Sequence, residues 1–187
     1  MKTLIIYGTR YGATAGTSEE IASVLRGEGF DVKVVNAKEE KIAGIGEFEL
    51  VIVGGGLQMG RWTSETEDFL KKFQKELAHK KVAIFVSSAM KPLLEREGKT
   101  EELEKTRQMF LEDKPAKLGL KPIAAALFGG VLDYNKMNLL ARKALGSMRT
   151  RFEAAGFKET KPGVYDTRDW DEIRDWARKL VLKARYL

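Results

Sequence analysis

The hydrophobic positions of this chain follow two alternating patterns. Short runs rich in Val, Ile, Leu and Phe, typical of buried strands, are separated by longer stretches in which apolar residues recur at helical spacing. The short runs predict strands over residues 2–7, 31–36, 49–54, 81–87 and 122–128. The longer stretches predict helices over residues 18–26, 64–77, 100–117, 138–155 and 169–184. Nearly continuous apolar strands between helices indicate a parallel sheet covered on both faces.

The alternation predicts an α/β fold, a doubly wound five-stranded parallel sheet with helices on both faces. No linker, repeat or low-complexity run divides the 187 residues, so we expect a single domain over residues 1–187. In such sheets, ligands bind beyond the carboxyl ends of the strands, where the strand order reverses. The loops after the first, third and fourth strands are therefore the candidate site.

The amino-acid composition limits the kinds of reactive or metal-binding site that the chain can form. The chain has no cysteine and one histidine, which excludes a disulfide, a thiolate zinc site, an iron-sulfur cluster, a thiol nucleophile and a multi-histidine metal site. Redox chemistry would need an organic cofactor. The apolar run at the amino terminus is too short for a signal peptide or a membrane span, so we expect a cytoplasmic protein.

The loop after the first strand is rich in hydroxyl groups and glycines. Four Thr or Ser residues and three glycines lie between Gly8 and Ser18. Backbone N–H groups at a helix amino terminus bind phosphate, glycines let the backbone approach it, and hydroxyls donate further hydrogen bonds. A plain helix cap, with Ser18 at the N-cap or Thr17 and Glu20 as a capping box, accounts for fewer of these residues. The candidate phosphate-binding residues are Thr9, Arg10, Tyr11, Gly12, Ala13, Thr14, Gly16, Thr17 and Ser18.

The other two loops offer small, apolar and aromatic residues. Glycines permit close approach to a flat ring, and apolar or aromatic side chains can stack on it. After the third strand the candidates are Leu57, Gln58, Met59, Gly60 and Trp62, and after the fourth they are Ser87, Ser88, Ala89 and Met90. The alternatives are that Trp62 is a packing residue and that the fourth loop is an ordinary strand-exit turn.

Residues 9–14 resemble the phosphate loop of the flavodoxin family. In that family the Thr of the loop is followed four residues later by Ala in the helix. Here Ser18 and Ala22 have that spacing, so the loop is expected to be about four residues longer. The resemblance implies a flavodoxin-like fold, FMN as the non-covalently bound cofactor, and electron transfer through it.

Nearly the whole chain resembles a narrower group. Residues 129–134, 165–170 and 177–178, with residues 69–72, are similar to the flavodoxin-domain group that includes menaquinone-dependent protoporphyrinogen dehydrogenase. This resemblance implies removal of hydrogens from a porphyrinogen and delivery of electrons to a quinone at the membrane. Three functions stay open: an electron carrier with a redox partner protein, a porphyrinogen dehydrogenase, and a cofactor-free interaction module.

The distribution of charge along the chain indicates which classes of partner it could bind. There are 33 Lys and Arg against 27 Asp and Glu, a net charge of +6, which suits an acidic partner, an anionic membrane or a substrate with carboxylates. Residues 136–161 hold seven of the cations and two glutamates, on a stretch with a helical apolar face. Such a stretch is typical of a core-packed helix or of peripheral contact with an anionic membrane. No nucleic-acid-binding motif is present, so no nucleic-acid partner is expected.

Overall fold

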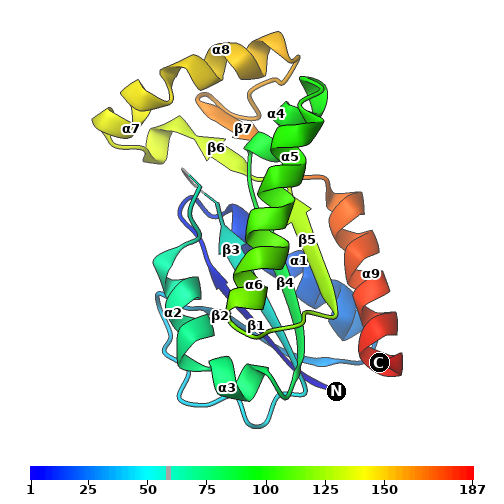
Figure 1. Cartoon of the computed structure of the whole chain (residues 1–187). Helices are drawn as coiled ribbons and strands as arrows, with labels where there is room; N and C mark the ends of the chain where they lie inside the picture. Colours follow the sequence, from blue (N-terminus) through cyan, green and yellow to red (C-terminus); the bar gives the residue numbers. More distant parts are fainter. Residues whose placement is uncertain (58–59) are drawn as a thin grey trace.

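The fold centres on one parallel sheet. The computed structural model describes residues 1–57 and 60–187. Its five-stranded sheet has the order β2-β1-β3-β4-β5, and every neighbouring pair is parallel (Figure 1). The strands are β1 (Lys2–Gly8), β2 (Asp31–Asn36), β3 (Leu50–Gly56), β4 (Lys81–Ser87) and β5 (Ala124–Phe128). The predicted α/β fold and its five-stranded sheet are confirmed.

Helices cover both faces of the sheet because the strands are apolar on both sides. On one face, α1 (Ala13–Gly27) and α9 (Trp170–Tyr186) pack Ile21, Ile173 and Leu180 against β-strand residues. The other face is covered by α2, α3 and a continuous helical run from α5 through η1 to α6. These elements are α2 (Ser64–Lys72), α3 (Gln74–Leu77), α5 (Thr100–Arg107), the π-helical η1 (Gln108–Asp113) and α6 (Lys114–Lys117).

The first helix begins earlier than the sequence indicates. It starts at Ala13, with Gly12 as the N-cap in the left-handed conformation (φ 93°). The expectation that Ser18 or a Thr17–Glu20 box caps this helix, after a lengthened loop, is therefore wrong. The physical reason is that Gly12 turns the chain into the helix without any side-chain cap among the described residues, so the pattern of capping residues misplaces the start.

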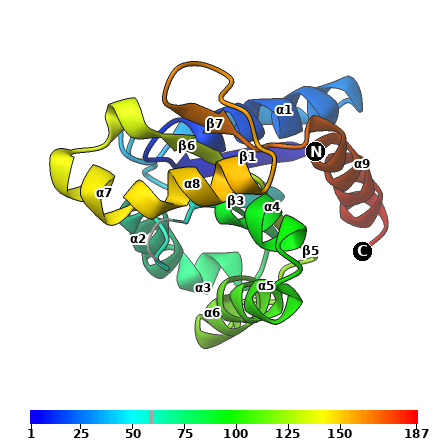
Figure 2. The ribbon, with the colours of Figure 1, turned by 90° about the horizontal axis from the view of Figure 1, so that it is seen from above.

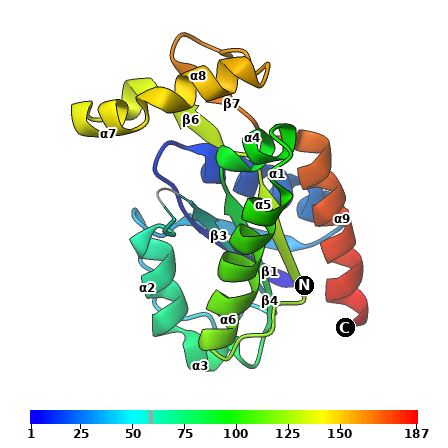
Figure 3. The same ribbon diagram turned by 45° about the horizontal axis from the view of Figure 1, so that its top comes forward.

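The part of the chain that follows β5 and precedes α9 forms a second, smaller layer. We call residues 131–166 the cap. Its strands β6 and β7 pair antiparallel, and its helices α7 and α8 lie over the carboxyl end of the main sheet (Figure 3). The elements of the cap are β6 (Val131–Asp133), η2 (Tyr134–Lys136), α7 (Leu139–Ala144), α8 (Gly146–Ala154) and β7 (Val164–Asp166). The single helix expected over residues 138–155 is thus divided at Leu145, and the β6–β7 pair was not predicted.

The cap has its own small core, shared with helix α4 (Met90–Arg96). Phe152 and Tyr165 are buried there, with Leu93 of α4 against them. Arg96 of α4 lies 3.7 Å from the ring centre of Phe157 and donates a hydrogen bond of 2.9 Å to the carbonyl of Ala155. These contacts fix α8 over α4.

Both ends of the cap leave the main sheet at one place, which we call the stem (Gly129, Gly130 and Thr167). The backbone N–H and the hydroxyl of Thr167 both donate to the carbonyl of Gly130, at 2.9 and 3.0 Å. A Cβ at Gly129 would lie 2.0 Å from the carbonyl oxygen of Thr167. Only glycine allows the two chain segments to approach this closely.

Candidate functional site

A cavity of about 370 Å³ lies between the carboxyl end of the sheet and the cap. All three loops singled out from the sequence contribute to its lining, which confirms that the ends of β1, β3 and β4 converge. The predicted site residues that line it are Thr9, Arg10, Tyr11, Ala13, Thr14, Leu57, Gly60, Ser87, Ser88, Ala89 and Met90. Gly12, Gly16, Thr17, Ser18 and Trp62 do not belong to the lining. Gln58 and Met59 lie outside the described residues.

The β1–α1 loop presents a helix amino terminus to the cavity. The hydroxyl oxygen of Thr9 accepts a 2.9 Å hydrogen bond from the backbone N–H of Gly12, which fixes the loop, and Ala13 and Thr14 open the helix at the cavity wall. The first N–H groups of a helix have no partner within the helix, and the dipole favours an anion there. The first turn contains no acidic residue. This end of the cavity is suited to a phosphate.

Of the predicted residues outside the lining, Gly16 and Thr17 have other contacts, and the buried Oγ of Ser18 has no hydrogen-bond partner among the described residues. A Cβ at Gly16 would lie 2.5 Å from the guanidinium of Arg168, so this glycine makes room for that side chain. The hydroxyl of Thr17 donates to the carbonyl of Ala13 at 3.2 Å, and Ser18 is fully buried within α1. The prediction that these three residues bind phosphate assumed a helix start near Ser18, whereas the helix starts at Ala13.

The three glycines that end β3 each make room for a different neighbour. A Cβ at Gly54 would lie 2.4 Å from the ring of Phe85, and one at Gly55 would lie 3.3 Å from the indole of Trp62. Only Gly56 lines the cavity, where its Cβ position is 3.3 Å from the hydroxyl of Thr14. Trp62 is buried in the core, 2 % exposed, so the structure favours the packing role for this residue.

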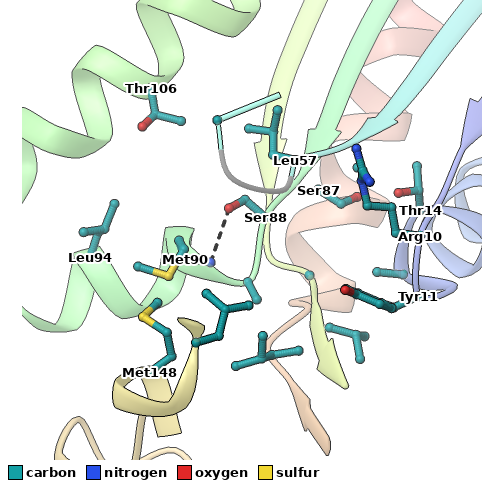
Figure 4. A pocket seen from close by; sticks show the side chains of 18 of the residues that line it. Arg10, Tyr11, Thr14, Leu57, Ser87, Ser88, Met90, Leu94, Thr106 and Met148 are labelled. Carbon is teal, nitrogen blue, oxygen red and sulfur yellow. Dashed lines mark hydrogen bonds between the residues drawn. The ribbon is translucent and has the colours of Figure 1, made fainter. Parts of the chain in front are cut away.

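The end of β4 supplies a buried hydroxyl without a partner. Ser87 is 4 % exposed, lines the cavity, and its Oγ has no hydrogen-bond partner among the described residues. Its neighbour Ser88 accepts a 3.3 Å hydrogen bond from the backbone N–H of Met90, drawn as the dashed line in Figure 4. A buried hydroxyl costs free energy unless it is paired, so Ser87 indicates a polar ligand atom at this wall.

The opposite wall of the cavity is mainly apolar, and most of it was missed by sequence reasoning. It comes from the cap and from α4, α5 and η1. Figure 4 shows Arg10, Tyr11 and Thr14 gathered on one side and Met90, Leu94 and Met148 on the other. The additional lining residues are Gly56, Leu94, Glu102, Thr106, Phe110, Gly130, Val131, Leu132, Leu145, Met148 and Phe152. Met148 and Phe152 stand out in the sequence only as an apolar helical stripe, which equally describes core packing.

Two cations, one in η2 of the cap and one just after the cap, lie beside the polar wall. Lys136 donates a 3.1 Å hydrogen bond to the carbonyl of Tyr11, and Arg168 donates one of 3.4 Å to the carbonyl of Ala13. Arg168 also pairs with Asp166 at 2.5 Å. Burial alone would raise the pKa of Asp166, but hydrogen bonds and charge from Arg168 outweigh it and hold this pKa below its usual value.

The positive charge of the cap is unevenly compensated. Arg149 pairs with Glu153 and Glu159 at 3.2 and 2.8 Å, and Arg151 pairs with Glu97 at 2.5 Å. At α7, by contrast, Arg142 donates to the backbone carbonyls of Tyr134 and Asn135. Both acceptors are uncharged, so these bonds do not neutralise its positive charge.

The same helix carries exposed leucines. Leu139 is 84 % exposed and Leu140 is 79 % exposed. Seen from above, α7 reaches beyond the sheet on the side of α2, away from α9 and the chain ends (Figure 2). The tip of α7 therefore combines apolar side chains with positive charge. Among the described residues, no helix has the length and apolarity that crossing a bilayer requires.

Comparisons with known proteins agree with this geometry. A family model described as a flavodoxin domain matches residues 4–157. The protoporphyrinogen IX dehydrogenase [quinone] of Escherichia coli K12 is 25% identical over 183 residues, covering 97% of this chain and 95% of its own. A solved flavodoxin from the domain Archaea matches over 100% of both chains with a TM-score of 0.56 and 15% identity. Oxidised flavodoxin 1 from Bacillus cereus matches 82% of this chain and 98% of its own, with a TM-score of 0.51 and 17% identity.

Proposed function

Because this chain belongs to the flavodoxin family, we propose that it binds FMN non-covalently in the cavity under the cap and transfers electrons through it. The observation that carries the proposal is the division of the cavity into a polar end and an apolar end (Figure 4). FMN has a phosphate at one end and a flat, largely apolar ring system at the other. When bound, FMN supplies the reversible uptake and release of electrons.

Each wall has a separate task in this proposal. The N–H groups at the start of α1 and the hydroxyl groups of Thr9 and Thr14 bind the phosphate. Ser87 provides a hydrogen bond to a polar atom of the cofactor, and Leu57 and Met90 contact the ring. The cap covers the site and limits the access of water.

The test is flavin content and flavin affinity. The purified full-length chain is expected to show the visible absorption of an oxidised flavin and to release FMN, identified by chromatography, on denaturation. The flavin-free protein is expected to bind added FMN in an equimolar ratio. Failure of the folded, flavin-free protein to bind FMN would contradict the proposal.

A second candidate function is the dehydrogenation of a porphyrinogen with a quinone as electron acceptor. The observation that favours it is the 25% identity to the E. coli dehydrogenase over 97% of this chain. Seven cations in residues 136–161 also suit a substrate with carboxylates. Anaerobic assay of the FMN-loaded chain with protoporphyrinogen and menaquinone separates this function from electron transfer to a redox partner protein. No oxidation of the porphyrinogen by fully loaded protein would exclude it.

Peripheral contact with an anionic membrane through the tip of α7 would bring the chain to a lipid-soluble acceptor. Leu139 and Leu140 are exposed there, next to Arg142 and Lys143. Apolar side chains flanked by cations bind the interface of anionic bilayers, and each basic residue near the surface contributes about 1 kcal/mol.

Vesicle sedimentation tests this contact. The chain is expected to bind phosphatidylglycerol vesicles and to bind phosphatidylcholine vesicles less. The double variant Leu139→Ser/Leu140→Ser is expected to lose most of this binding, whereas the control Leu182→Ser, an exposed leucine of α9, keeps it. Equal binding by the double variant and the unmodified chain would contradict the contact.

A further inference from the structure

We propose that Lys136 of the cap is a positioning residue for the FMN phosphate, and that the phosphate, through Lys136, holds the cap closed over the cavity. This inference rests on the proposed binding of FMN. It assigns to the cap a role that neither the fold nor the cavity lining implies, because Lys136 lies outside that lining.

The first observation is the position of the ammonium group. Lys136 ends the short helix η2 of the cap, and its Nζ donates a 3.1 Å hydrogen bond to the carbonyl of Tyr11, in the β1–α1 loop. The same Nζ lies 3.9 Å from the place where a Cβ would stand on Gly12, the N-cap of α1. One side chain thus joins the cap to the loop that begins the phosphate-binding helix.

The second observation is electrostatic. The amino terminus of a helix carries a partial positive charge, so cations near it are unfavourable unless an anion is present. Here Arg10, Lys136 and Arg168 all lie in or beside the loop or first turn of α1, which has no acidic residue of its own. Arg168 is paired with Asp166, and Lys136 is paired with Asp133 at 3.8 Å, so two carboxylates face three cations around this helix start. A phosphate dianion would supply the missing negative charge.

The third observation points to a ligand independently of the helix end. The buried hydroxyl of Ser87 has no partner among the described residues and lines the same cavity. A ligand that reaches both Ser87 and the start of α1 spans the space that the cap covers. The charge on Lys136 then favours the closed cap more strongly when the ligand carries its phosphate.

Riboflavin lacks the phosphate that FMN carries, so the difference between the affinities for the two flavins isolates the contribution of the phosphate. The flavin-free, full-length chain would be titrated with each flavin by fluorescence, in the unmodified form and as Lys136→Gln. The variant is expected to bind FMN about tenfold more weakly, because it loses the attraction between the ammonium group and the two negative charges of the phosphate, which salt screens only in part. Riboflavin affinity is expected to stay within about twofold.

Two further variants serve as controls. Lys136→Arg keeps the charge and is expected to retain most of the FMN affinity. Lys158→Gln removes another exposed lysine of the cap and is expected to leave both affinities unchanged. Equal losses of FMN and riboflavin affinity in Lys136→Gln, or no loss of either, would overturn the inference. If the unmodified chain binds neither flavin, the proposed function itself fails, which is a distinguishable result.

Hydrogen exchange of the unmodified chain gives a readout that depends on no variant. FMN is expected to slow amide exchange across η2 and α7 at least about threefold more than saturating riboflavin does. Equal protection by the two flavins would show that ring contacts alone close the cap, and would overturn the coupling.

Discussion

The two walls of the cavity are built by different means. The wall at the sheet edge combines backbone groups and short hydroxyl side chains with Arg10, Tyr11 and Leu57, all on loops that follow paired strands. The wall formed by the cap consists of the apolar side chains of Leu145, Met148 and Phe152, held above the sheet by the stem and by contacts with α4. A ligand in this cavity would therefore meet polar groups of the sheet layer on one side and apolar side chains of a separately anchored layer on the other.

The largest expected effect comes from breaking the anchor of the cap. In Gly129→Ala the new methyl group would lie 2.0 Å from the carbonyl oxygen of Thr167, a backbone atom that cannot rotate away. We expect a loss of about 3 kcal/mol in the free energy of unfolding, measured by urea denaturation. Gly146→Ala is the matched control, because a Cβ there has no neighbour within 4 Å. Equal stability of the two variants would show that the stem is not a close contact in solution.

The next largest effect tests the wall at the sheet edge. Thr14→Ala removes a buried hydroxyl at the start of α1, and hydrogen bonds to charged groups contribute about 1.5 to 3 kcal/mol. We expect FMN affinity to fall by about 2 kcal/mol while riboflavin affinity changes little. Thr17→Ala is the control, since its hydroxyl already bonds to the carbonyl of Ala13. A larger loss in Thr17→Ala than in Thr14→Ala would reverse this assignment.

A smaller effect, which does not depend on the phosphate, is expected at the cavity wall formed by the cap. Met148→Ala removes a partly buried side chain from the apolar side of the cavity. We expect FMN and riboflavin to lose the same affinity, about 1 kcal/mol, because the contact is with the ring and not with the phosphate. The ratio of the two affinities is the measurement. A change in that ratio would show that the two walls are not separate in function.

The smallest effect concerns pH. Arg168 holds the pKa of Asp166 below its unfolded value, so this pair stabilises the folded chain above the unfolded pKa, and the stability is lost as pH falls through the folded pKa. We expect unfolding experiments between about pH 5 and pH 2 to show a steeper loss of stability in the unmodified chain than in Asp166→Asn. The difference should be below about 1 kcal/mol, because the pair is partly solvated. Parallel pH profiles would exclude this contribution.

The sheet could be predicted from the sequence because its strands are local and strongly patterned. Each of the five apolar runs became a strand with ends within about two residues of the prediction, and the order of loops around the site followed from the topology. The start of α1 was misplaced because Gly12 gives no side-chain capping signal, whereas Thr17 and Ser18 give a misleading one.

The cap could not be predicted for a different reason. Its strands β6 and β7 have three residues each, and the paired residues Leu132 and Tyr165 are far apart in the sequence. Such short strands have no periodicity that distinguishes them from loops. The apolar wall of the cavity depends on the same long-range pairing, so a residue such as Phe110 on η1 could not be assigned to the site from its own neighbours in the chain.

The stem has a consequence for how this protein can be altered. The chain enters and leaves the cap side by side, since Gly130 and Thr167 at its two ends are joined by hydrogen bonds. Any other connection between these two residues would begin and end at the same place, and it would also have to cover the surface of α4 that Leu93 and Arg96 present to the cap. A different insertion at the stem would thereby change the wall of the cavity that faces the sheet and leave the β1–α1 loop in place.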